Sequence, residues 1–124
     1  MSALVKVLIV DDALFMRSMI KDILLNTGRF EIVGEAGDGR EAVRKFQELR
    51  PQIVTMDIVM PELDGIEATR EILRLDPQAI VIMCSALGQE ALVVESISAG
   101  ARDFIVKPFT PEKVIRVVDT LTDR

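Results

Sequence analysis

Histidine is absent from this sequence, and cysteine occurs only once. Without histidine the chain can form neither a Ser-His-Asp triad nor a histidine-ligated zinc site, and it cannot carry a phosphohistidine of its own. A single cysteine excludes an intramolecular disulfide and any CxxC redox or zinc motif. Histidine-dependent hydrolases and dithiol redox proteins are therefore excluded.

Tryptophan and tyrosine are also absent, and positive charge is in deficit. The 15 Lys and Arg residues against 20 Asp and Glu residues give a formal net charge of −5. Nucleic-acid binding requires a positive face and commonly uses aromatic rings for base stacking, so we expect no nucleic-acid partner. No apolar run approaches the ~18 residues of a membrane span, and the first residues do not resemble a signal peptide. These absences predict a cytoplasmic domain without membrane insertion.

The chain has enough apolar residues for one compact domain. It has 124 residues, of which 49% are hydrophobic. A chain of this length can bury roughly two-thirds of its unfolded surface but is too short for two ordinary domains. We therefore expect a single domain over residues 1–124, with no effector domain.

Short apolar runs alternate with amphipathic stretches along the whole sequence. The apolar runs predict β-strands over residues 5–10, 30–36, 53–56, 80–84 and 104–106. The amphipathic stretches predict helices over residues 13–26, 38–49, 64–76, 90–99 and 110–121. Strict alternation of strands and helices predicts an α/β fold, with a parallel sheet covered by helices on both faces.

Polar residues follow four of the five predicted strands. Asp11 and Asp12 follow the first strand, and Asp57 follows the third. Ser85 and Lys107 follow the fourth and the fifth. Ligands of open parallel sheets bind outside the carboxyl ends of the strands, so these side chains are expected at one edge of the sheet.

Each of these residues alone has an ordinary structural explanation. An Asp after a strand is most often the N-cap of the next helix, while Ser85 suits a turn and Lys107 suits a solvated position. Three carboxylates brought together would repel one another, however, unless a cation offsets their charge. Mg²⁺ suits such a site because it binds a few carboxylates and keeps several waters.

These side chains also fit phosphoryl transfer. A carboxylate can attack phosphorus to give an aspartyl phosphate, and the reaction depends chiefly on positioning and on neutralising the phosphoryl oxygens. The metal, the Lys107 ammonium and the Ser85 hydroxyl could each serve one of those oxygens.

Six short motifs resemble, in order and spacing, those of the receiver domain of two-component response regulators. They are Val-Asp-Asp (10–12), Met-Asp (56–57), Met-Pro-Glu-Leu-Asp-Gly (60–65), Ser-Ala (85–86), Gly-Ala (100–101) and Lys-Pro-Phe (107–109). The resemblance covers essentially the full chain and is strongest to stand-alone members of the chemotaxis type. It implies a flavodoxin-like fold, a doubly wound sheet of five parallel strands in the order 2-1-3-4-5 with five helices.

The resemblance also assigns roles at the acidic site. It implies that Asp57 is the phosphoacceptor. It further implies that Mg²⁺ is held by Asp11, Asp12, Asp57 and the main-chain carbonyl of Val59. The protein would then not be an enzyme toward an external substrate, but a signalling phosphoacceptor that catalyses its own phosphorylation and its own slow dephosphorylation.

Further residues match the family's switch and phosphoryl-contacting positions. The resemblance implies that Ser85, Ala86 and Lys107 contact the phosphoryl group, that Phe104 is the aromatic switch residue, and that Pro108 follows a cis peptide bond. Many relatives have Tyr at position 104. Phe104 lacks the hydroxyl group of that tyrosine.

The implied partners are proteins. The phosphoryl donor would be a phosphohistidine on a histidine kinase, and the output partner a protein such as a component of the flagellar switch. The fourth helix, fifth strand and fifth helix would form the output surface. The side chains of Val59 and Leu87 cannot orient an attacking water. This predicts slow hydrolysis of the aspartyl phosphate and a separate phosphatase that ends the signal.

We expect the protein to be a monomer.

Other interpretations stay open at this point. The chain could be a receiver domain taken from a longer regulator. A Mg²⁺-dependent phosphatase of the haloacid dehalogenase type is disfavoured, because Val59 stands where those enzymes have a second Asp. A flavin- or nucleotide-binding domain is disfavoured because Asp11 and Asp12 would repel a phosphate.

Overall fold

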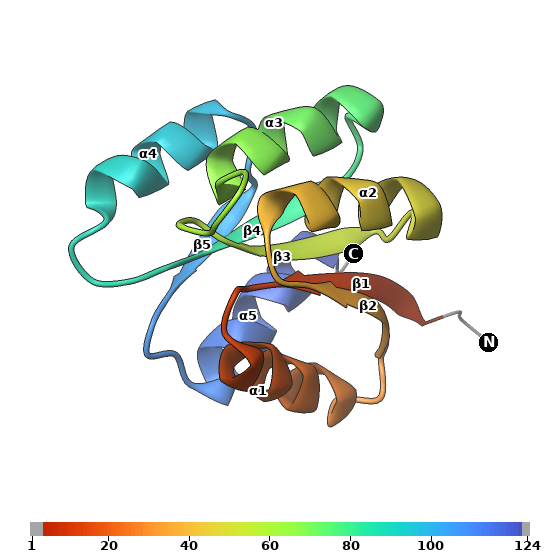
Figure 1. Ribbon diagram of the computed structural model, residues 1–124. Coiled ribbons are helices and arrows are strands. Elements are labelled where there is room, and N and C mark those ends of the chain that lie inside the picture. The colour runs from red at the N-terminus through yellow and green to blue at the C-terminus, as the bar shows by residue number, and fades with distance from the viewer. Residues whose placement is uncertain (1–3, 123–124) are drawn as a thin grey trace.

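Five β-strands and five α-helices alternate along the chain in the computed structural model, which describes residues 4–122 (Figure 1). The strands are β1 (Val5–Val10), β2 (Phe30–Ala36), β3 (Ile53–Asp57), β4 (Ile80–Ser85) and β5 (Asp103–Val106). The helices are α1 (Leu14–Leu25), α2 (Gly39–Leu49), α3 (Gly65–Leu75), α4 (Glu90–Ser98) and α5 (Pro111–Thr122). Within these described residues, no helix is both long and apolar enough to cross a membrane.

The strands form one parallel sheet in the order β2-β1-β3-β4-β5. The predicted fold class and strand order are therefore confirmed. Helices α2, α3 and α4 cover one face of the sheet, and α1 and α5 cover the other (Figure 1). Chain order reverses between β1 and β3, which places a ligand-binding crevice outside the carboxyl ends of these two strands.

Each face of the sheet packs against its own hydrophobic core. Alternate residues of the central strands point to opposite faces, so that Val54 and Met56 join the core under α2, α3 and α4. Ile53 and Ile82 join the core under α1 and α5. This burial on both faces explains why the sequence of the central strands is almost continuously apolar.

The third and fourth strands each extend one residue beyond the predicted end. Asp57 is the last residue of β3 and pairs with Cys84, while Ser85 is the last residue of β4 and pairs with Val106. The pairing holds the backbone of both residues in the sheet. Asp57 and Ser85 are therefore fixed by strand geometry and do not belong to loops.

The N-cap residues of α2 and α1 differ in kind. Asp38 accepts a hydrogen bond from the backbone N–H of Glu41 at 2.8 Å and is the N-cap of α2. At α1 the N-cap is Ala13, so the ordinary explanation of Asp12 as an N-cap is wrong. The side chain of Asp11 instead accepts a hydrogen bond from the N–H of Ala13 at 2.9 Å.

Helix α1 buries only part of its apolar residues. Phe15 and Met16 stand at the start of the apolar pattern of this helix, but Phe15 is 70% exposed. The stripe that packs inward contains Ile20, Ile23 and Leu24, with Met16 packed against it. Phe15 lies about 100° around the helix from Met16, which turns it away from the sheet.

Gly65, the first residue of α3, determines how close the helix comes to the acidic strand end. Its N–H donates to the carbonyl of Ile58 at 2.7 Å, and a Cβ built there would lie 2.0 Å from the carbonyl oxygen of Asp57. Because that neighbour is backbone, only a shift of the loop or of β3 could relieve the clash.

We expect Gly65→Ala to lower the free energy of unfolding by about 1–3 kcal/mol, as overpacking typically does. Urea unfolding followed by circular dichroism measures the change. Gly37→Ala is the matched control, because a Cβ there meets its nearest atom, Arg17 Nη1, at 3.6 Å. Equal stability of the two variants would contradict the close packing between α3 and β3.

Candidate functional site

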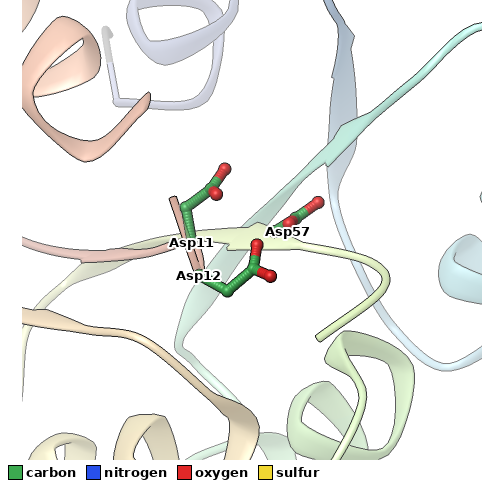
Figure 2. A group of neighbouring side chains, drawn as sticks. All are labelled: Asp11, Asp12 and Asp57. Carbon is green, nitrogen blue, oxygen red and sulfur yellow. The ribbon is translucent and has the colours of Figure 1, made fainter. Parts of the chain in front are cut away.

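Three carboxylates meet at the carboxyl edge of the sheet, where β1 and β3 end (Figure 2). Asp11, Asp12 and Asp57 each offer one oxygen, and these oxygens all lie within 4.8 Å of one another. Asp11 is 1% exposed and Asp57 is 8% exposed, whereas Asp12 is open to solvent. The structure therefore brings the predicted acidic residues together, with one carboxylate on the solvent side.

Lys107 supplies positive charge to this cluster. Its Nζ donates to Asp11 Oδ2 at 2.9 Å and to Asp57 Oδ1 at 3.3 Å. Its backbone N–H donates to the carbonyl of Ser85, and the Lys107–Pro108 peptide bond is cis. Burial lowers the pKa of Lys107, but the hydrogen bond to Asp11 and the two negative charges outweigh it and raise the pKa above its ordinary value.

The site holds more negative than positive charge. Burial and the neighbouring charges of Asp11 and Asp12 raise the pKa of Asp57 to about 6, although Lys107 partly opposes the shift. At pH 7 Asp57 is still mostly ionised, so the three carboxylates face a single ammonium. Carboxylate oxygens at this spacing with an uncompensated charge fit a hard divalent cation such as Mg²⁺.

Asp11 and Asp12 differ in how they are held. Both oxygens of Asp11 accept protein hydrogen bonds, one from Ala13 N–H and one from Lys107 Nζ. The backbone of Asp11 is held as well: its N–H donates to the carbonyl of Ala36 at 3.0 Å, and its carbonyl accepts from Arg17 Nη1 at 2.6 Å.

Arg17 is a residue that the sequence reasoning missed. Besides the carbonyl of Asp11, it contacts Glu35 Oε1 through Nε at 3.0 Å. Lys21 also binds Glu35, and the hydrogen bonds from these two cations outweigh burial and lower the pKa of the Glu35 carboxyl. The sequence does hold an indication of the Arg17–Glu35 ion pair. A basic residue stands in the first turns of α1, and an acidic residue stands near the end of the neighbouring strand β2.

Exposed apolar side chains follow the two strand ends that carry Asp57 and Ser85. Val59 and Leu87 lie two residues beyond Asp57 and Ser85, and they are 57% and 77% exposed. Ala86 is exposed beside them, but its N–H donates to Gln89 Oε1 at 2.6 Å. Ala86 is one of the residues predicted to contact a phosphoryl group, and its N–H already has a partner within the chain.

Ser85 and Phe104 lie on the side of the site toward α4. Ser85 is buried, and within residues 4–122 no hydrogen bond joins its hydroxyl to the three carboxylates. Phe104 on β5 is partly exposed, and with Ser85 it lines a largely apolar groove of about 540 Å³. The groove continues along α4 through Val94 and Ile97.

A doubly wound parallel sheet that carries a carboxylate cluster and one lysine at its carboxyl edge defines a phosphoacceptor domain of the receiver type. The family model for the response regulator receiver domain matches residues 7–119. The chain belongs to the response regulator receiver domain family.

Curated relatives and solved structures agree with this assignment. Chemotaxis protein CheY of Thermotoga maritima is 57% identical over 117 residues, which cover 94% of this chain and 97% of that protein. CheY of Bacillus subtilis is 56% identical over 114 residues, with 92% and 94% covered. The structure of a CheX-CheY-BeF3-Mg complex from Borrelia burgdorferi matches with 41% identity and a TM-score of 0.89, covering 97% and 90% of the two chains. The chain is a CheY-like signalling phosphoacceptor, as the resemblance implied.

Proposed function

We propose that this protein is a chemotaxis response regulator that accepts a phosphoryl group on Asp57 from a phosphohistidine of a CheA-like histidine kinase. The observation that carries the proposal is the position of Asp57, whose Oδ1 lies 3.3 Å from Lys107 Nζ inside the carboxylate cluster. The chain has no histidine, so a phosphohistidine donor has to be on another protein.

The transfer is an in-line displacement. An oxygen of ionised Asp57 attacks phosphorus, the phosphorus–nitrogen bond to the donor histidine breaks, and the imidazole nitrogen that leaves takes its proton from solvent. Lys107 is within reach to neutralise a phosphoryl oxygen, and the Ser85 hydroxyl can donate to another. For the Ala86 amide to bind a third oxygen, the side chain of Gln89 must leave it.

The proposed cation site consists of Asp11, Asp12, Asp57 and the main-chain carbonyl of Val59. When bound, Mg²⁺ supplies positive charge that offsets both the carboxylates and the phosphoryl oxygens. Asp11 is held by protein hydrogen bonds before any cation arrives, while Asp12 provides the solvent-exposed ligand.

The proposed output is a change in partner binding, for example to a flagellar-switch protein. The surface consists of α4, β5 and α5, and its centre is the apolar groove between α4 and β5. Phosphorylation draws Ser85 toward the phosphoryl oxygen, and Phe104 moves inward, which changes the groove that both residues line. Phe104 has no hydroxyl, so the groove recognises its partner mainly through apolar contacts.

Intact-mass measurement with acetyl phosphate tests the proposal. The parent should gain one phosphoryl group in Mg²⁺ and none in EDTA, and Asp57→Asn should gain none. Asp12→Ala should need more Mg²⁺ than the parent for the same rate. A gain that survives Asp57→Asn would contradict the proposed acceptor, and a rate unaffected by Asp12→Ala would contradict the proposed metal ligand.

We further propose that the phosphorylated state decays slowly and that a separate phosphatase ends the signal. Val59 and Leu87 flank the approach of water but offer it no hydrogen bond. The CheY relative from Borrelia burgdorferi, solved together with CheX, supports a role for a partner protein. Such a partner would bring a polar side chain into the opening beside Ala86.

We expect Val59→Asn and Leu87→Glu each to speed the decay of phosphorylated protein, because each adds a group that can orient the attacking water. Decay is followed by intact mass after the phosphodonor is removed. Leu75→Asn is the control, since Leu75 is also exposed but is the last residue of α3, at the end of the helix away from the acidic site. If both substitutions leave the decay unchanged or slow it, water positioning does not explain the lifetime.

A further inference from the structure

Arg17 connects the segment Asp11–Asp12, which follows β1, to the neighbouring strand β2 through two separate hydrogen bonds. Its Nη1 donates to the main-chain carbonyl of Asp11 at 2.6 Å, and its Nε donates to Glu35 Oε1 at 3.0 Å. The side chain is 18% exposed, so it is largely enclosed between α1 and β2. Arg17 thus contacts the backbone of one acidic residue without touching its carboxylate.

Glu35 is a firm anchor for this arrangement. It is the second-last residue of β2 and pairs with Ile9 in the sheet, next to the point where β1 leads into Asp11. Its other carboxylate oxygen accepts from Lys21 Nζ at 3.0 Å. The position of the Arg17 guanidinium is therefore determined by the sheet as well as by α1.

The carbonyl that Arg17 binds belongs to the peptide group joining Asp11 to Asp12. The contacts of Asp11 described above already fix its side chain and its N–H. Asp12 is exposed, so the orientation of this peptide group is what directs its carboxylate toward Asp57. The hydrogen bond from Arg17 restricts rotation of that peptide group.

We infer that Arg17, anchored by Glu35, is a positioning residue of the cation site and that it sets the orientation of Asp12. The inference rests on the proposed function in taking Mg²⁺ as the cation. It assigns Arg17 no contact with the metal or the phosphoryl group. Its effect is on the affinity for the cation, because a ligand held in place loses less freedom when the cation binds.

The charge of Arg17 and its hydrogen bonds have opposite effects on Mg²⁺ binding. A positive charge near the site repels the cation, so removal of charge alone would tighten binding. Arg17→Lys keeps the charge but replaces a rigid fork of donors by one ammonium, which cannot reproduce both contacts in the same geometry. Arg17→Lys therefore tests positioning with the charge held constant.

Lys21→Met provides the matched control. Lys21 binds the same Glu35 carboxylate at 3.0 Å, but among residues 4–122 it forms no hydrogen bond to Asp11 or Asp12. Glu35→Gln removes the carboxylate charge that anchors Arg17, while residue 17 itself remains an arginine. Both substitutions lie outside the cluster that forms the proposed site.

Two measurements in each variant separate positioning from loss of fold. Backbone amide shifts of Asp12 and Ala13 in NMR, titrated with MgCl₂, give the affinity for Mg²⁺ directly. Intact mass with acetyl phosphate gives the Mg²⁺ concentration for half-maximal phosphorylation and, separately, the maximal rate. A variant that only loses stability would keep the parent's affinity for Mg²⁺ and its half-maximal Mg²⁺ concentration as long as it stays folded.

We expect Arg17→Lys to weaken Mg²⁺ binding roughly tenfold, within the range for residues that support metal ligands, and to keep most of the maximal rate at saturating Mg²⁺. Glu35→Gln should give a smaller change in the same direction, and Lys21→Met should stay within about twofold of the parent. Equal Mg²⁺ affinity in Arg17→Lys and the parent would overturn the inference. If the affinities change as expected but even the parent takes no phosphoryl group, the proposed function fails while the role of Arg17 holds.

Discussion

Asp57→Asn is expected to make the unphosphorylated protein more stable at neutral pH without Mg²⁺, although it removes the residue proposed to be essential for function. The pKa of Asp57 is raised to about 6 by burial and by the charges of Asp11 and Asp12. Its charge therefore opposes folding once it ionises. A shift of this size corresponds to at most about 3 kcal/mol, and partial solvent screening reduces the expected gain to about 1–2 kcal/mol.

The pH dependence of this gain follows from the direction of the shift. A raised pKa means that the folded state binds the proton more tightly, so the parent keeps its full stability from this group only below the unfolded pKa near 4. That contribution is lost as the pH rises through about 6. The advantage of Asp57→Asn should therefore be largest above pH 7 and shrink toward pH 4.5.

Urea unfolding in EDTA at pH 7.5 and pH 4.5 measures this difference. Asp22→Asn is the control, because Asp22 is an exposed residue of α1 away from the site, and it should change stability little at either pH. A variant Asp57→Asn that is less stable than the parent at pH 7.5 would contradict the view that the carboxylates are held together against their repulsion.

Lys107→Met is expected to have the opposite effect. It removes the only ammonium that contacts the cluster among residues 4–122 and leaves the Asp11 carboxylate, which is 1% exposed, with one of its two hydrogen bonds. Breaking a buried ion pair from one side typically costs 3–5 kcal/mol, and because Lys107 is partly exposed we expect about 2–3 kcal/mol.

Added Mg²⁺ should stabilise Lys107→Met more than it stabilises the parent, because in the variant the cation is the sole positive charge beside the carboxylates. Parallel urea titrations with and without Mg²⁺ give both values. Lys113→Met on α5 is the control, since its exposed side chain lies outside the cluster. If Lys107→Met matches Lys113→Met in stability, the contacts of Lys107 do not neutralise the site as described.

The sheet and the acidic site could be predicted because both follow from periodic or local features of the sequence. Apolar runs separated by amphipathic stretches leave few ways to build a parallel sheet. Once its strands are parallel, residues at or just beyond the strand ends, such as Asp57 and Asp12, must lie at one edge. The acidic cluster could therefore be predicted from this rule alone, without knowing how the side chains pack in three dimensions.

The features that the sequence did not indicate depend on rotation and register. Periodicity shows that α1 has an apolar face. It does not show that α1 packs on the sheet in an orientation that leaves Phe15 exposed. It does not show that Arg17 reaches the carbonyl of Asp11 and the carboxylate of Glu35, because those contacts depend on how α1 packs beside β2. The difference between enclosed Asp11 and exposed Asp12 likewise arises from three-dimensional contacts of two adjacent identical residues.

Asp57, and neither of its acidic neighbours, is the proposed acceptor of the phosphoryl group. Borohydride reduction of phosphorylated protein converts an acyl phosphate on aspartate to homoserine, which marks the acceptor permanently. Trypsin separates the candidates, because Asp11 and Asp12 fall in the peptide 7–17 and Asp57 falls in the peptide 46–70. Fragmentation of the second peptide distinguishes Asp57 from Asp64. We expect homoserine at position 57 alone, and only when Mg²⁺ was present during phosphorylation; homoserine at position 11, 12 or 64 would contradict the account.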